Sequence, residues 1–158
     1  MADQQDKKNN KDKKYEPTVA HLPWEIKRAE RAMARLLDMK LRGTGLTKSQ
    51  FGVIQALEHM DKASSAELAR TVFVTPQAMV GLVTTLEQKG YIERTQSEAS
   101  ARIIEARLTP AGRAAWRRAV TKLSQVDELL QSEFSATELV RLGRLMRRLG
   151  GFMDQDEK

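Results

Sequence analysis

Apolar residues recur every three or four positions along most of the chain, a spacing that predicts a mainly helical fold. A first helix is expected over about residues 23–41, where Ile26, Met33 and Leu37 are separated by charged residues. Later helix starts are predicted by a Ser or Thr followed three positions on by Glu or Gln, or by a Thr-Pro pair. These signals begin at Thr47, Ser64, Thr75, Thr109 and Ser135. We expect these helices to end near His59, Val72, Lys89, Ser132 and Leu149, with Gly90 and Gly150 in the positions that C-terminal glycines take.

One stretch, from Tyr91 to Leu108, departs from the helical spacing. In its second half, the apolar residues Ile104, Ala106 and Leu108 stand at every other position, a period that indicates a β-strand. The polar run 96–101 separates this strand from the apolar start of the segment and predicts the tip of a hairpin. We therefore expect a mainly α protein whose only β element is one small hairpin.

The predicted order is helix, helix, a tight turn at Phe73-Val74, helix and hairpin, which is the order of a winged helix-turn-helix. The helix after the turn, Pro76 to Lys89, has an inner apolar stripe of Met79, Leu82, Val83 and Leu86. Its other face carries short polar side chains, which suit insertion into a DNA major groove about 12 Å wide. Taken alone, such a face is equally typical of an ordinary amphipathic surface helix.

Arginines in the hairpin favour the DNA-binding interpretation. Arg94 and Arg102 flank the predicted tip, where arginines can enter a minor groove or bind phosphates, although solvated strand arginines are the alternative. We predict a DNA-contacting set drawn from these arginines, the helix after the turn and the start of the helix before it. The set is Ser64, Ser65, Thr75, Gln77, Ala78, Gly81, Thr84, Thr85, Gln88, Arg94 and Arg102.

Charge and composition narrow the classes of partner. The formal net charge of +6 and the pI near 9.7 favour a polyanionic partner such as DNA. Residues 1–17 are polar and lysine-rich, which predicts a disordered arm that is either a solvated tail or a weak DNA contact. The absence of cysteine excludes thiol redox sensing and cysteine-based zinc sites, and two histidines are too few for a typical metal cluster. We expect no cofactor.

The chain shows no sign of membrane insertion or export. No apolar run approaches the roughly 20 residues of a membrane span, and residues 1–14 lack the apolar region of a secretory signal. We therefore expect a cytoplasmic protein without a membrane partner.

Three short motifs follow one another between Ser65 and Gly112. Residues 65–70 read Ser-Ala-Glu-Leu-Ala-Arg, and residues 82–94 read Leu-Val-Thr-Thr-Leu-Glu-Gln-Lys-Gly-Tyr-Ile-Glu-Arg. Residues 102–112 read Arg-Ile-Ile-Glu-Ala-Arg-Leu-Thr-Pro-Ala-Gly. In order and spacing, this segment of about 50 residues resembles the MarR family of bacterial transcription regulators. The resemblance assigns the motifs to the first helix of the reading motif, to the end of the recognition helix with the first wing strand, and to the second wing strand with the next helix.

The sequence departs from the family pattern at Thr84, Thr85 and Ser100. The family usually has Asp-Arg at the first two positions, and Asp at the third, two residues before the wing arginine. Because these aspartates normally help to anchor arginines, we expect the wing to be held by other contacts. Without the usual recognition-helix arginine, Gln77 and the threonines should carry more of the sequence specificity.

The resemblance also implies a homodimer. It divides a single domain, residues 18–152, into a DNA-binding lobe at about 46–109 and dimerisation helices at about 18–42 and 110–152, followed by a polar tail at 153–158. The two C-terminal helices carry more apolar surface than one chain of this size needs, at Trp116, Val120, Leu123, Val126, Leu130, Leu139, Leu142, Leu145, Met146 and Leu149. A two-fold dimer would place its reading helices about 34 Å apart, so we expect a pseudo-palindromic double-stranded DNA site.

A small effector ligand is a further implication of the resemblance. Family members often bind small, frequently aromatic acids between the dimer helices and the DNA-binding lobe, and are then released from DNA. Arginine beside an aromatic side chain can hold a carboxylate and a ring. The candidates are Trp24, Arg28, Arg31, His59 and Trp116, with dimer core and plain surface as the alternative interpretations.

Two other functional classes are an enzyme and a winged helix that does not act as a regulator. An enzyme is not expected, since the sequence has no cysteine, no glycine-rich phosphate loop and no histidine near a serine at a known spacing. A winged helix that docks proteins, or that binds DNA architecturally without an effector, stays open as the alternative. The wing arginines and the positive charge disfavour pure docking, and a DNA affinity that falls steeply with salt would distinguish the two.

Overall fold

A computed structural model of the chain describes residues 21–98 and 100–156, with the backbone alone at residues 101 and 152–156. Its helices are α1 (Leu22–Leu41), α2 (Lys48–Met60), α3 (Ser65–Thr71), α4 (Pro76–Gln88), α5 (Pro110–Glu133) and α6 (Ala136–Asp156). Its strands are β1 (Lys62–Ser64), β2 (Ile92–Ser97) and β3 (Ser100–Leu108). The predicted N-terminal arm, 1–17, lies outside the described residues. None of the helices described is long and apolar enough to cross a membrane.

Two compact units are distinguished in the chain, Met1–Ala34 and Arg35–Lys158. The described part of the first unit is residues 21–34, the N-terminal part of α1, where Leu22 and Trp24 are exposed. The second unit contains the end of α1, with its buried Leu41, and every other helix and strand. The second unit therefore contains the predicted DNA-binding lobe.

Side-chain caps start the helices of the second unit where the sequence predicts them. The Thr47 hydroxyl accepts the Gln50 N–H at 3.2 Å, and the Gln50 side chain accepts the Thr47 N–H at 3.3 Å. The same reciprocal arrangement starts α3. Thr75 and Thr109 each precede a proline at the first helical position, where the missing N–H has no helical partner to lose.

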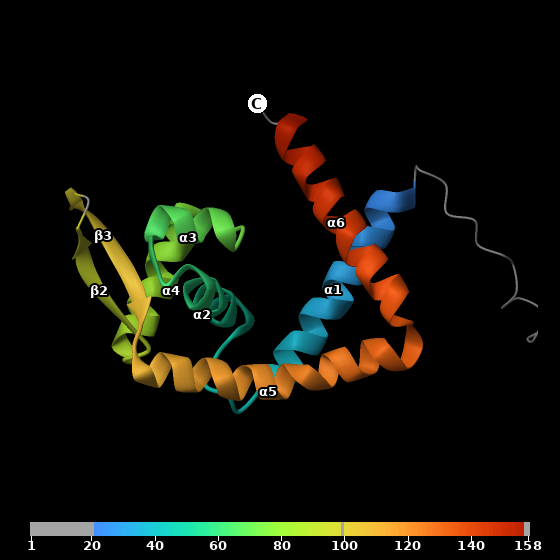
Figure 1. The fold of residues 1–158 in the computed structure, drawn as a ribbon, viewed down its shortest axis with the longest axis horizontal. Helices are drawn as coiled ribbons and strands as arrows, with labels where there is room; N and C mark the ends of the chain where they lie inside the picture. Colours follow the sequence, from blue (N-terminus) through green and yellow to red (C-terminus); the bar gives the residue numbers. More distant parts are fainter. Residues whose placement is uncertain (1–20, 99, 157–158) are drawn as a thin grey trace, which may run out of the picture. The chain divides into compact units, whose positions relative to one another are not determined.

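The strands form one antiparallel sheet in the order β1-β3-β2, with β2 and β3 as the predicted hairpin (Figure 1). Ile92 stands opposite Leu108 in the hairpin, and Ala63 of β1 stands opposite Ala106 on the other edge of β3. The hairpin was predicted as the only β element, and this is wrong because the additional strand β1 pairs with β3. A strand of three residues is too short to show a period of two, and its pairing partner lies some 40 positions further along the chain.

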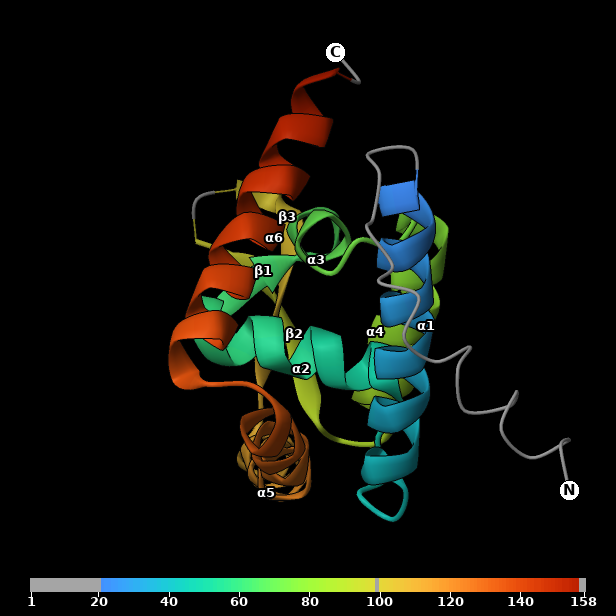
Figure 2. The same cartoon turned by 90° about the vertical axis from the view of Figure 1, so that its right-hand side faces the viewer.

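The core of the second unit lies between α2, α3, α4, the sheet and the first part of α5 (Figures 1 and 2). Its largest fully buried side chains are Leu41, Val53, Ile54, Leu57, Leu68, Met79, Val83 and Leu86. Three of these, Met79, Val83 and Leu86, come from the predicted inner stripe of α4. Burying each is worth about 1.5–3 kcal/mol, so this stripe fixes which face of α4 points outward.

The C-terminal helices differ from the prediction at one point. α6 continues through Gly150 to Asp156, so the prediction that Gly150 ends the helix is wrong. A glycine lowers the helix propensity by about 1 kcal/mol but does not by itself stop a helix. On α5, Trp116 and Leu123 pack against the core, whereas Leu142 and Met146 of α6 remain exposed.

Candidate nucleic-acid interface

α4 presents the predicted reading face to solvent. The exposed members are Thr75, Gln77, Ala78, Gly81 and Gln88, and the half-buried members are Thr84 and Thr85. The Thr85 hydroxyl donates to the Gly81 carbonyl at 2.8 Å, so that its remaining capacity is to accept. The Thr75 hydroxyl accepts the Ala78 N–H at 3.2 Å as the N-cap. The side-chain amide of Gln77 is therefore the group best placed, at the start of α4, to read a base edge.

The two serines predicted to contact DNA lie at the start of α3 and are less available. The Ser64 hydroxyl donates to the Glu67 carboxylate at 2.6 Å, and the Ser64 backbone N–H donates to it at 2.8 Å. Both hydrogen bonds lower the pKa of Glu67, and the bond from the Ser64 hydroxyl has the larger effect. Ser65 is half-buried. Ser64 thus serves as a helix cap, and its hydroxyl hydrogen is already used.

The tip of the wing is shorter than the predicted run 96–101. β2 ends at Ser97, which pairs with Ser100 at the start of β3, so both positions belong to strands and not to the tip. Arg102 follows on β3 with an exposed side chain, and its backbone N–H donates to the Ser100 hydroxyl at 3.3 Å. Within the described part of the chain, no ion-pair partner is found for the Arg102 guanidinium. Its charge is available to a phosphate or a minor groove.

The sequence predicted that Arg94 flanks the tip of the hairpin, but the structure places it elsewhere. It stands opposite Ala106 in the middle of the hairpin, and its guanidinium forms an ion pair with Glu87 in the last turn of α4. The hydrogen bond and the charge of Arg94 lower the pKa of Glu87, while the same contact raises the pKa of Arg94. Arg94 therefore connects the wing to the reading helix.

Two more ion pairs cross the sheet. Arg107 of β3 contacts Glu93 of β2 at 2.8 Å, and Lys62 of β1 contacts Glu105 of β3 at 3.1 Å. The hydrogen bond to Glu105 raises the pKa of Lys62. Together with the pair of Glu87 and Arg94, these ion pairs connect the wing strands to each other and to α4, with threonine at position 84 and serine at position 100.

Two of the five candidate ligand residues come together in the second unit. The Trp116 indole N–H donates to Gln55 Oε1 at 2.8 Å, and Gln55 Nε2 lies 3.0 Å from His59 Nε2. The chain Trp116–Gln55–His59 thus joins α5 to the exposed end of α2. Within residues 21–98 and 100–156, no group of three or more His, Asp or Glu side chains is arranged to hold a metal ion.

The other three candidates belong to the first unit. Trp24 is 74 % exposed, Arg31 is exposed, and Arg28 forms an ion pair with Glu25 at 2.8 Å. Arg28 and Glu25 are three positions apart on α1, a spacing at which side chains meet on the helix surface. These residues stay predictions for ligand binding.

Sequence reasoning missed two exposed apolar side chains beside the reading face. Phe73, in the turn before α4, is 86 % exposed, and Val80, on the outer face of α4, is 56 % exposed. Phe73 also has a positive φ of 55°. The sequence signal that could have identified Phe73 was an aromatic residue directly after a helix, at a position where glycine is usual.

The chain is similar to known transcription regulators over most of its length. Residues 44–103 match the MarR family. An HTH-type transcriptional repressor of Mycobacterium tuberculosis is 36% identical over 106 residues, which cover 67% of this chain and 76% of that protein.

Solved structures show the same fold at lower identity. A mutant MarR of Escherichia coli in complex with operator DNA superposes with a TM-score of 0.74 at 22% identity, covering 84% of this chain and 99% of that one. Bordetella bronchiseptica BpsR, in a structure concerned with regulation of its DNA binding by 6-hydroxynicotinic acid, gives a TM-score of 0.72 at 22% identity over 84% of this chain and 98% of that one. The predicted winged helix-turn-helix fold is confirmed, and the chain belongs to the MarR family of transcription regulators.

Proposed function

We propose that this protein is a dimeric, non-enzymatic repressor that acts in the cytoplasm and binds a pseudo-palindromic duplex through α4 and the wing. The observation that carries the proposal is the outward polar face of α4, fixed by its buried inner stripe, beside a wing whose Arg102 is exposed near the tip. A relative named as a transcriptional repressor, and a MarR structure solved with operator DNA, support it.

Each contact residue has a distinct role in this proposal. Gln77 reads a base edge with its side-chain amide, and the threonines of α4 make shorter contacts in the major groove. Arg102 binds a phosphate or enters the minor groove. Arg94 positions the wing through Glu87 and does not itself read DNA in the arrangement described.

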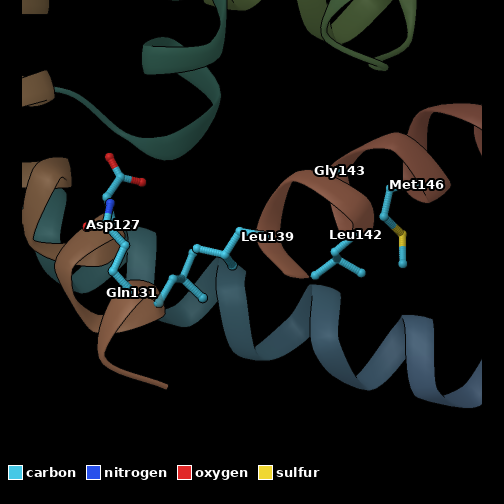
Figure 3. Close-up of a pocket in the computed structure, with 7 residues that line it drawn as sticks. Asp127, Gln131, Leu139, Leu142, Gly143 and Met146 are labelled. Carbon is cyan, nitrogen blue, oxygen red and sulfur yellow. The ribbon is translucent and has the colours of Figure 1, made fainter. Parts of the chain in front are cut away.

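The dimer is proposed to form through α5 and α6 together with residues 18–42. A groove of about 370 Å³ lies between α5 and α6, with Leu139, Leu142 and Met146 from α6 and Asp127 and Gln131 from α5 along it (Figure 3). Several large apolar side chains of α6 are exposed in the single chain, which is unusual for a stable monomer. A second copy of the same helices would cover this apolar surface.

A charge placed in the groove tests the dimer. We expect Leu142→Asp to give a monomer at micromolar concentration in light scattering, because the aspartate would be buried without a partner. Arg141→Asp is the control, since Arg141 is an exposed charged residue of α6 that does not line the groove and does not belong to its apolar surface. A wild-type protein that is itself monomeric would refute the dimer.

The effector is proposed to be a small aromatic acid. BpsR, a structural neighbour, is described as regulated by 6-hydroxynicotinic acid, which is such a compound. In the second unit, the Trp116–Gln55–His59 group offers an aromatic ring and an imidazole to such a compound. Addition of aromatic acids to the protein–DNA complex should raise the dissociation constant, and His59→Ala should weaken that response.

Selection of bound duplexes from a randomised pool tests DNA reading directly. The selected duplex should contain two related half-sites, and its affinity should fall steeply as salt rises, since phosphate contacts release counterions. Gln77→Ala should alter the selected sequence. Arg102→Ala should reduce the salt slope by about one, whereas Arg117→Ala, which removes the same charge from the exposed surface of α5, should not. A shallow slope and no enriched sequence would instead favour a protein-docking domain.

A further inference from the structure

α3 and α4 end in the same backbone motif. At the end of α4, Gly90 has a φ of 68° and donates its N–H to the Glu87 carbonyl at 2.8 Å, while the Tyr91 N–H donates to the Leu86 carbonyl at 3.0 Å. This pair of bonds satisfies the last carbonyls of a helix and needs a left-handed residue at its centre. Glycine takes that conformation without strain.

At the end of α3, the left-handed residue is Phe73. Its φ is 55°, its N–H donates to the Arg70 carbonyl at 3.4 Å, and the Val74 N–H donates to the Ala69 carbonyl at 3.1 Å. A side chain with a Cβ is unfavourable in this conformation, and an aromatic one is uncommon there. The chain thus places a strained phenylalanine where it uses glycine one helix later.

Burial of the ring does not offset this strain. The Phe73 side chain is 86 % exposed, whereas its neighbours Val72 and Val74 are half-buried and pack against the core. The fold therefore gains little from the ring, and the ring is held in water by the turn. An observed backbone outlier of this kind points to a function outside the folded chain itself.

The position of Phe73 suggests what covers the ring. It stands two residues before Thr75, the N-cap of α4, and four before Gln77. Recognition helices of this motif approach base edges with their N-terminal residues, so a side chain just before the helix meets the edge of the groove. There the DNA offers phosphate oxygens and the apolar C–H surface of deoxyribose, and a phenyl ring suits only the second.

We propose that Phe73 packs on a deoxyribose at the edge of the major groove when α4 binds DNA. The contact is continuous with the reading face, and it rests on the proposed DNA-binding function. Because every nucleotide carries the same sugar, Phe73 contributes affinity without sequence preference. Because a sugar is uncharged, its loss leaves the salt dependence of binding unchanged.

Phe73→Asn separates this role from a structural one, since asparagine tolerates the left-handed conformation. We expect the variant to bind the duplex selected with the wild-type protein about tenfold or more weakly, with the same salt slope and the same sequence in a repeated selection. Its Tm should rise by about 2 °C or more, because the strain is removed. Affinity and stability should thus change in opposite directions.

Asp61→Asn is the control for an asparagine placed at another position of positive φ. Among the residues described, Asp61 is the other non-glycine residue with a positive φ, at the end of α2, with a φ of 64° and a ψ of −51°. It should keep the affinity of the wild type or bind slightly more tightly, because it loses a negative charge.

The outcomes separate this proposal from the function on which it rests. If the wild type binds the selected duplex and Phe73→Asn binds it with the same affinity, the sugar contact alone is overturned. A changed sequence preference or salt slope in Phe73→Asn overturns it as well, in favour of a base or phosphate contact. A wild-type protein that enriches no duplex overturns the DNA-binding function, and the sugar contact with it.

Discussion

Gly112 should be intolerant of even one added methyl group. It is the third residue of α5, and its N–H donates to the Thr109 hydroxyl at 3.1 Å. A Cβ at this position would lie 2.0 Å from the Tyr91 carbonyl oxygen and 2.9 Å from the Tyr91 carbonyl carbon. The same oxygen accepts the Thr109 N–H at 3.1 Å, so that it cannot move away without losing a bond between the wing and α5.

The expected magnitude for Gly112→Ala follows from this geometry. Overpacking costs about 1–3 kcal/mol, and the upper end applies here because the obstructing atoms are backbone atoms that carry a hydrogen bond. Alanine recovers at most about 1 kcal/mol of helix propensity. We therefore expect a net loss of about 2 kcal/mol in the free energy of unfolding, which for a chain of this length lowers the Tm by roughly 4–8 °C.

Thermal unfolding followed by circular dichroism, at one fixed protein concentration, measures this loss. The concentration must be fixed because association of chains shifts the Tm. Gly81→Ala is the matched control, because Gly81 lies inside α4 and an added Cβ meets nothing within 4 Å. It should raise the free energy of unfolding by up to about 1 kcal/mol. A Tm for Gly112→Ala equal to or above that of the wild type would refute the reasoning.

Two further predictions concern single contacts. Glu87→Gln should lower the Tm at neutral pH by removing the ion pair with Arg94. Since Arg94 lowers the pKa of Glu87 below its ordinary 4.5, this stabilisation is present above that pH and is lost as the pH falls through the folded-state pKa. The Tm values of the two proteins should therefore converge once the pH lies below the folded-state pKa of Glu87, and a constant gap would contradict the assignment. Trp116→Phe should cost about 1 kcal/mol by removing the indole bond to Gln55, and little of this cost should remain in a Gln55→Ala background; fully additive losses would argue against that bond.

Elements whose signals are local were predictable from the sequence. The caps at Thr47, Thr75 and Thr109 mark helix starts because a side-chain oxygen reaches a backbone N–H only three residues on. The inner stripe of α4 was predictable because one repeat of 3.6 residues decides which side chains face the core. In both cases the responsible interactions lie within a few residues of one another along the chain.

Features that depend on distant contacts were not predictable. β1 exists because Ala63 pairs with Ala106, a partner that no local pattern in a strand of three residues reveals. Gly150 has the composition of a helix end, yet α6 continues through it to Asp156. Phe73 was assigned only to a turn, because a residue type does not indicate its own φ.

Arg94 is a residue whose predicted functional role changes once its distant contacts are known. Its spacing from Arg102 suggested two equivalent wing arginines, but the register places Arg94 beside Glu87 and leaves Arg102 near the tip. Glu87 is in the last turn of α4, so the ion pair fixes the first wing strand to the helix that reads DNA. A wing tied in this way keeps Arg102 at a set position relative to Gln77, without an aspartate at Ser100. The two residues that we propose to contact different grooves therefore lie on elements that the Glu87–Arg94 ion pair connects.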